Sequence, residues 1–200
     1  MIDDAKRVKA EYRSSIRSKV LIKNALLSLM REKSFDKISV TDIVDRADIN
    51  RGTFYAHFKD VRDVLDKICA GMVDEILFSI KETDVEDIVK DNSIVFKKIS
   101  DYISKDLEYF KLILKIDGIH DFILRKKSDA IRVLLESDEI SKSLVDMKEA
   151  EVVIDFAISA IVDTYSDIVL ERLSVTLDEA PQYLSKIINT VLRYYPRETR

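Results

Sequence analysis

The scarcity of turn-forming residues is the strongest constraint on what this chain can fold into. Only three glycines and two prolines occur in 200 residues, whereas β-sandwiches, β-meanders and glycine-rich nucleotide-binding loops all need frequent turns. Hydrophobic residues make up 46% of the sequence, which is enough to bury a substantial core. Together these observations predict an all-helical protein.

Charge is distributed unevenly along the chain. The formal net charge is -4, but residues 1–65 carry +4 and the remainder carries -8. The N-terminal third of the chain is thus basic and the remainder is acidic. The single cysteine, Cys69, excludes an internal disulfide and a cysteine-based zinc site. No apolar run approaches the roughly 18 residues of a membrane span, so we expect a cytoplasmic protein without a membrane partner.

Apolar spacing divides the N-terminal part into short segments. Residues 1–15 are polar and basic, which predicts either a loosely ordered arm or a helical extension. Over residues 17–33 apolar side chains recur every three or four positions, as in an amphipathic helix. Two shorter helices are predicted at residues 41–47, with Thr41 as the N-cap, and at residues 51–58, with Asn50 as the N-cap.

The remaining apolar segments bring the total to about nine helices. Asp60 can cap a fourth helix that ends near Lys81. Further segments lie at residues 93–105, 107–116, 119–136, 148–173 and 178–195. Segment 148–173 is apolar around most of its circumference, so it must be buried on more than one side. Such burial fits the core of one large domain, or a helix that packs on its own core and on a second copy of the chain. Because the last helix offers a second apolar stripe, we expect a homodimer formed through the last two helices.

Residues 41–58 have the pattern of a helix-turn-helix. Two short helices are joined by a three-residue turn with Ile49 in its middle, and in such motifs the second helix enters the major groove of DNA. Phe54 and Phe58 lie four residues apart on one face of the second helix, while polar side chains cover the rest.

The stretch TDIVDRADINRGTFYAHFKD, residues 41–60, resembles the DNA-binding signature of the TetR/AcrR family of bacterial transcriptional regulators. The resemblance implies a three-helix DNA-binding domain that a fourth helix joins to a helical domain for ligand binding and dimerisation. We accordingly expect a basic arm at residues 1–15, a TetR-type helix-turn-helix domain at 16–60 and the effector-binding and dimerisation domain at 61–200.

The resemblance also assigns DNA contacts. It implies phosphate contacts from Thr41, Tyr55 and His57, base contacts from Arg51 and Thr53, and close approach to the groove at Gly52. Arginine can bond guanine bidentately, threonine offers a hydroxyl and a methyl group, and glycine lets the backbone come near the duplex.

Two departures from the family pattern concern the ends of the recognition helix. The family often has glycine where Asp48 stands, and aspartate tolerates the left-handed conformation better than most residues. A lysine common just after the recognition helix is Val61 here, so Lys59 or Arg62 is expected to supply that phosphate contact.

Six residues of the C-terminal part are candidates for binding a small-molecule effector. They are Phe96, Tyr102, Phe110, Phe122, Asp155 and Tyr165. The aromatic residues, like Phe78, fit an effector pocket or plain core, and Asp155 fits a polar anchor or an exposed position in a groove. No motif there has a defined chemistry, so the sequence leaves the effector unidentified.

Several other residues have a structural interpretation beside a functional one. The basic residues Lys6, Arg7, Lys9 and Arg13 suit a solvated tail or an arm that reaches DNA. Cys69 suits a small buried hydrophobe better than a redox sensor. His120 suits a loop or helix start better than a ligand contact.

The sequence thus predicts a ligand-responsive bacterial repressor that binds a palindromic operator as a homodimer and is released by an effector. A transcriptional activator, or an effector-independent regulator of the same fold, is the alternative. A helical-bundle enzyme is a more distant alternative, because the chain lacks Glu-x-x-His pairs, a glycine-rich phosphate loop and a Gly-x-Ser-x-Gly motif. Neither a metal nor a cofactor is predicted.

Overall fold

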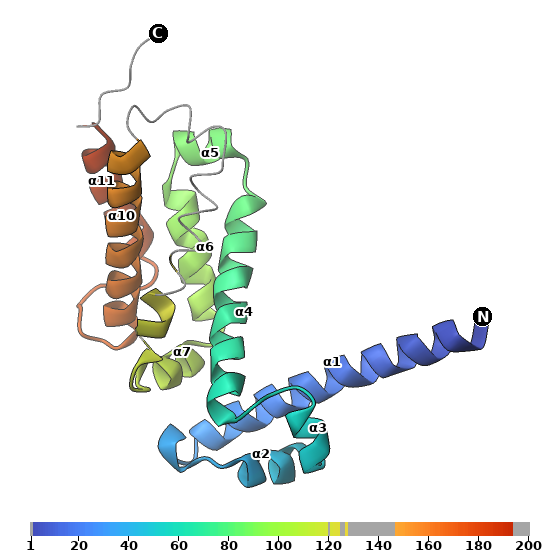
Figure 1. Ribbon diagram of the computed structural model, residues 1–200. Coiled ribbons are helices and arrows are strands. Elements are labelled where there is room, and N and C mark those ends of the chain that lie inside the picture. The colour runs from blue at the N-terminus through green and yellow to red at the C-terminus, as the bar shows by residue number, and fades with distance from the viewer. Residues whose placement is uncertain (1, 120, 125–126, 128–146, 194–200) are drawn as a thin grey trace. The chain divides into compact units, whose positions relative to one another are not determined.

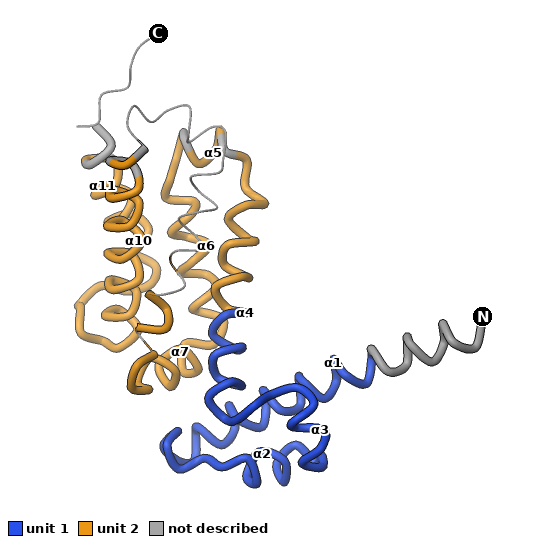
Figure 2. Tube along the Cα trace, viewed as in Figure 1, with its two compact units in different colours: residues 1–71 blue, residues 72–200 orange. Residues whose placement is uncertain are grey.

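A computed structural model describes residues 2–119, 121–124, 127 and 147–193 of the chain (Figure 1). Within these ranges every regular element is a helix, which confirms the all-helical prediction. The chain divides into two compact units, residues 1–71 and 72–200 (Figure 2). The division lies inside one helix, whereas the sequence placed the start of the second domain at residue 61; the domain limits stay a prediction.

Unit 1 contains three helices and the beginning of a fourth. They are α1 (Ile2–Met30), α2 (Val40–Ala47), α3 (Arg51–Tyr55) and α4 (Val61–Lys81), with a 3-10 turn at Phe35–Lys37 between α1 and α2. The first element begins at Ile2, so residues 2–15 are a helical extension and not a loose arm. Side chains of α1 are described from Arg13 onward.

The start of α2 corrects one detail of the sequence analysis. Its N-cap is Ser39 and not Thr41, because the Ser39 hydroxyl accepts a hydrogen bond from the Asp42 amide while the Asp42 carboxylate accepts one from the Ser39 amide. This reciprocal capping box satisfies two backbone donors at once, and it shifts the helix start by one residue. Thr41 therefore lies in the first turn of α2.

The core of unit 1 is made from the apolar faces of its helices. Ile22 and Leu26 of α1, Ile43 of α2, Phe54 of α3 and Leu65 of α4 are each 0% exposed. The three- and four-residue spacing of buried residues along α1 is the amphipathic pattern that the sequence predicted. Burial of these side chains fixes α2 and α3 against α1.

The described residues of unit 2 contain the rest of α4 and five further helices. They are α5 (Val85–Lys90), α6 (Ser93–Ser104), α7 (Leu107–Leu114), α10 (Met147–Val169) and α11 (Ala180–Arg193). A buried cluster joins α6, α10 and α11 and includes Phe96, Ile103, Tyr165, Val169 and Leu184. Most of the predicted helix at 119–136 lies outside the described residues.

The long helix α10 ends earlier than predicted. It stops at Val169 and not at residue 173, because Glu171 adopts a left-handed conformation with φ 58°, which an α-helix cannot continue through. Phe78 is a second correction: it is 65% exposed on α4, so it belongs to no core. No helix in the described ranges is long and apolar enough to cross a membrane.

Candidate nucleic-acid interface

The recognition helix α3 is held at both ends by its own sequence. At its start the Asn50 side chain accepts from the Thr53 amide at 2.8 Å, which confirms Asn50 as the N-cap. At its end Phe54 and Phe58 are both buried, with ring centroids 6.0 Å apart. The regular helix stops at Tyr55, three residues before the predicted end, and the Phe58 amide still bonds to the Phe54 carbonyl.

The turn between α2 and α3 depends on one unusual backbone conformation. Asp48 has φ 51° and ψ 52°, in the left-handed region. Its amide donates to the carbonyls of Val44 and Asp45, and the Ile49 amide donates to Val44 at 3.1 Å. Aspartate therefore closes α2 in the conformation for which glycine is the usual residue.

Glycine at position 52 has a structural role inside this cap. A Cβ built on Gly52 would lie 3.2 Å from Oδ1 of Asn50, which is the atom that caps the helix. Any larger residue would press on the cap. Glycine therefore avoids this crowding at the helix start. It also permits the close approach to DNA that the resemblance implies.

The predicted DNA-contacting residues gather on α2, α3 and the start of α4. Thr41, Arg51, Gly52, Tyr55 and Lys59 are exposed, and Thr53, His57 and Arg62 are half-buried. The structure brings two of them together across the motif, because Nη2 of Arg51 donates to the hydroxyl of Thr41 at 2.6 Å. Arg62 pairs with Asp66 at 3.0 Å on α4.

A link between the end of α3 and the start of α4 was missed by the sequence analysis. Nζ of Lys67 donates to the backbone carbonyl of His57 at 2.9 Å and to Asp63 at 2.9 Å, and it lies 4.8 Å from the Phe58 ring centroid. Asp63 also accepts from the Lys59 amide at 2.9 Å. The i,i+4 spacing of Asp63 and Lys67 was the one feature of the sequence that could have predicted part of this link.

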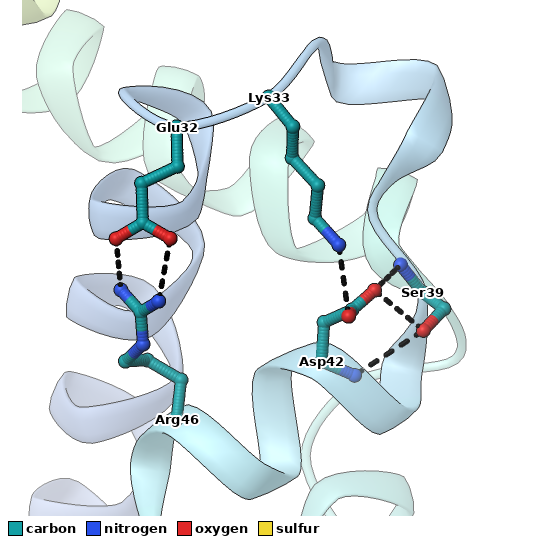
Figure 3. Close-up of polar contacts among 5 residues, drawn as sticks. All are labelled: Glu32, Lys33, Ser39, Asp42 and Arg46. Atoms are coloured by element: carbon teal, nitrogen blue, oxygen red, sulfur yellow. Dashed lines mark hydrogen bonds and ion pairs between the residues drawn. The ribbon is translucent and has the colours of Figure 1, made fainter.

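Ion pairs join α2 to the turn that follows α1 (Figure 3). Arg46 of α2 forms a bidentate pair with Glu32, at 2.8 and 2.7 Å, and Lys33 lies 2.8 Å from Asp42. The hydrogen bond from Arg46 lowers the pKa of Glu32. The pKa of Asp42 is well below its usual range because Lys33 and Ser39 donate to its carboxylate.

The candidate effector residues fall into separate surroundings. Phe96 and Tyr165 are buried in the core of unit 2, where the Tyr165 hydroxyl donates to the Phe96 carbonyl at 2.7 Å. Burial raises the pKa of Tyr165 to about 12. Tyr102 and Phe110 are half-buried and pack edge to face, with centroids 5.8 Å apart.

The remaining candidates lie apart from this core. Phe122 is half-buried. Asp155 pairs with Lys127 at 2.8 Å, so its carboxylate already has a partner. His120 lies outside the described residues.

A cavity in unit 2 is lined by none of the six candidate effector residues. It has a volume of about 630 Å³ and lies beside α11, next to the start of α6. Its lining is mainly polar and includes Asp91, Asp178, Gln182 and Lys186. Sequence reasoning had no signal for it, because these residues form no motif.

No cluster of metal-ligating side chains occurs in the part of the chain that the structure describes. Cys69 is buried on α4, and burial, together with the charge of Asp66, raises the pKa of its thiol to about 12. The thiol therefore stays protonated near neutral pH.

The capped helix pair, its left-handed turn and the exposed donors of α3 define a helix-turn-helix DNA-binding protein. Residues 22–68 match the family model for bacterial regulatory proteins of the tetR family. The chain therefore carries a DNA-binding domain of the tetR-family type. The resemblance seen in the sequence is thereby confirmed.

Two curated relatives share parts of the chain. It is 29% identical over 134 residues to the dhaKLM operon transcriptional activator DhaS of Lactococcus lactis, covering 58% of this chain and 67% of DhaS. It is 21% identical over 105 residues to the uncharacterized HTH-type transcriptional regulator YxbF of Bacillus subtilis, covering 50% of this chain. The match spans only 27% of the length of YxbF.

The fold extends over nearly the whole chain. A TetR-family transcriptional regulator from Syntrophomonas wolfei superposes with a TM-score of 0.65 at 16% identity, covering 91% of this chain and 98% of that one. At this identity the likeness shows the fold: an N-terminal helix-turn-helix followed by a helical C-terminal domain.

Proposed function

We propose that this protein is a homodimeric repressor that binds a palindromic operator in the cytoplasm and is released by a small-molecule effector. The observation that carries the proposal is the recognition helix itself. The apolar side of α3 is anchored by Phe54, which is 0% exposed, while Arg51 and Tyr55 are exposed. Reading base edges in the major groove requires hydrogen-bond donors on a helix that is held in place.

Base reading falls to Arg51 and Thr53, because they lie in the first turn of α3, the part of a recognition helix that contacts base edges. Tyr55, His57 and Lys59 follow toward its end and serve phosphate contacts, with Thr41 and Arg62 on the flanking helices. The Thr41 hydroxyl accepts a hydrogen bond from Arg51, and Arg51 exchanges this partner for a base when the protein binds DNA.

Homodimerisation is supported by exposed apolar side chains on the last two helices. Val152 and Phe156 of α10 are 68% and 71% exposed, and Tyr183 and Ile187 of α11 are 51% and 58% exposed. On each helix the two side chains lie four residues apart on one face, and exposed apolar faces support an interaction surface. A two-fold dimer that reads a palindrome holds its two recognition helices about 34–36 Å apart, one turn of the duplex.

Effector control needs a ligand that distinguishes two states of the protein. Tyr102, Phe110, Phe122 and Asp155 are only half-buried, so they remain accessible candidates, whereas Phe96 and Tyr165 would act by shaping the core around them. A coupling free energy of about 1–3 kcal/mol between the effector and DNA sites is typical and sufficient to change operator occupancy.

The decisive experiment is selection of bound duplexes from a random library. The expected result is a palindrome with half-sites about one helical turn apart. Arg51→Ala should then relax the preference at one position of each half-site, at a cost of about 1–3 kcal/mol. Tyr55→Phe should weaken all sequences alike, because a phosphate contact carries no sequence information. Failure to enrich any motif would refute the operator hypothesis.

An activator is the second candidate, because DhaS, at 29% identity, is named as an activator. Repression and activation differ in what bound protein does to transcription and not in DNA binding. Transcription in vitro from a promoter that carries the selected motif distinguishes them: a repressor lowers transcript yield and an activator raises it.

A further inference from the structure

The N-terminal half of α1 projects beyond the part of the chain that the family model covers. That match begins at Ile22, which is also the first buried residue among the α1 side chains that the structure describes. None of residues 13–21 is buried. This stretch is nevertheless helical and continuous with the core portion of α1. The core of unit 1 therefore does not explain why the helix extends so far.

The part of α1 that follows Glu11 carries charge of one sign. Between Glu11 and Glu32 there are five basic residues and no acidic one. Four of them form two i,i+4 pairs, Arg13 with Arg17 and Lys19 with Lys23. At 1.5 Å per residue, Arg13 and Lys23 lie about 15 Å apart along the helix axis.

These four cations differ from four other basic residues of unit 1. Lys33, Arg46, Arg62 and Lys67 each pair with a carboxylate. Within the described part of the chain none of the four α1 cations forms a salt bridge, and Arg13, Arg17 and Lys19 are exposed. Four like charges held on one helix without counter-charges favour a polyanionic partner.

The neighbouring elements identify which polyanion fits. This helix packs against α2 and α3 within unit 1, so its cations are carried by the same rigid unit that presents the recognition helix. Ile16, Val20 and Leu21 are the exposed large apolar residues among them, at 44%, 49% and 36%. A membrane-surface helix needs a broad apolar face, and three partly exposed side chains do not provide one.

We propose that Arg13, Arg17, Lys19 and Lys23 of α1 bind the phosphates of duplex DNA beside the half-site that α3 reads. The proposal rests on the DNA-binding function inferred above and adds to it an electrostatic surface that is independent of sequence. Phosphate contacts of this kind release counterions, so each one steepens the fall of affinity with salt.

The test replaces all four cations by glutamine, which keeps helix propensity. Fluorescence anisotropy measures binding of the R13Q/R17Q/K19Q/K23Q protein and the wild type to the selected operator and to a scrambled duplex, over a series of salt concentrations. The slope of log Kobs against log[salt] should become shallower by about 0.9 for each phosphate that the variant no longer neutralises. The affinity ratio between operator and scrambled duplex should stay unchanged.

A control variant separates local binding from net charge. K97Q/K105Q/K115Q/K186Q removes four exposed lysines of unit 2 and changes the net charge by the same amount. The proposal expects the wild-type slope for this control. A wild-type slope for the α1 variant, or an equal reduction in both variants, overturns it.

Two further outcomes are informative. Binding to phosphatidylserine vesicles that the α1 variant loses while its DNA slope is unchanged would identify a membrane as the partner and overturn the proposal. If the library yields no operator, the proposed function fails, yet the slopes on the scrambled duplex still decide whether α1 binds phosphates. Circular dichroism of both variants verifies that the helices are intact.

Discussion

The turn residue Asp48 allows backbone strain to be separated from charge. Its φ of 51° and ψ of 52° place Cβ close to the following carbonyl oxygen, which costs most L-residues about 1–2 kcal/mol. Glycine avoids this crowding but loses about 0.5–1 kcal/mol more in conformational freedom on folding. Aspartate and asparagine lie between glycine and alanine, because their short polar side chains hydrogen-bond locally.

The free energy of unfolding should therefore follow a fixed order. Asp48→Gly is expected to raise it by about 0.5 kcal/mol and Asp48→Ala to lower it by about 1 kcal/mol, while Asp48→Asn leaves it unchanged. Urea denaturation followed by circular dichroism measures all three values. The glycine and alanine variants bracket the wild type, so the comparison does not depend on one absolute value.

DNA affinity should follow a different order. All three substitutions remove the same negative charge from the turn between α2 and α3. In water, a unit charge about 10 Å from one phosphate changes affinity by about two-fold, so the three variants should each bind DNA about two-fold more tightly than the wild type. Anisotropy with a labelled duplex, under conditions where every variant is folded, measures this.

Two results would refute this reasoning. If Asp48→Ala is as stable as Asp48→Gly, the turn carries no left-handed strain. If Asp48→Asn and Asp48→Gly differ in DNA affinity, the conformation of the turn, and not its charge, sets the affinity.

Three further predictions concern unit 1. Ser39→Ala should lower the free energy of unfolding by about 1 kcal/mol, because it removes the capping side chain of α2; Ser39→Thr keeps an N-cap hydroxyl and should lose less in the same urea titration. The lowered pKa values of Asp42 and Asp63 add stability that is complete above about pH 5 and is lost as the pH falls through 4 and below; denaturation at pH 6 and 3.5 should show this loss, and Asp42→Asn should reduce it. The Cys69 thiol, with its pKa raised to about 12, should react with Ellman's reagent at pH 8 about a thousand-fold more slowly than an ordinary cysteine; rapid labelling of the folded protein would contradict its burial.

The helix-turn-helix was predictable from sequence because local contacts determine it. Asn50 bonds to Thr53 three residues away, and Asp60 accepts from the Asp63 amide at 2.7 Å over the same separation. Both caps were predicted from residue type and position. The misplaced cap of α2 is also a local matter: two hydroxyl residues, Ser39 and Thr41, precede the helix, and the carboxylate at Asp42 selects the one three positions before it.

The contacts that sequence reasoning missed in unit 1 join residues further apart. Lys67 reaches the His57 carbonyl across ten positions, and Arg46 reaches Glu32 across fourteen. Such pairs depend on how helices cross, which apolar spacing does not specify. The extent of α1 was left open between a loose arm and a helical extension, because residues 1–15 are polar and basic and show little apolar periodicity.

Separation along the chain also explains why the DNA site is better determined by sequence than the effector site. In α3 the side chains that would bind DNA lie within a few residues of the cap that positions them, so residue type and spacing specify both together. In unit 2 the Tyr165 hydroxyl is placed by Phe96 and Ser100, 69 and 65 residues away. The shape of that core thus depends on how α6 and α10 pack, and any substitution in either helix can alter it. A family that keeps its DNA-reading helix can therefore change its effector through scattered core residues, because no local motif ties them together.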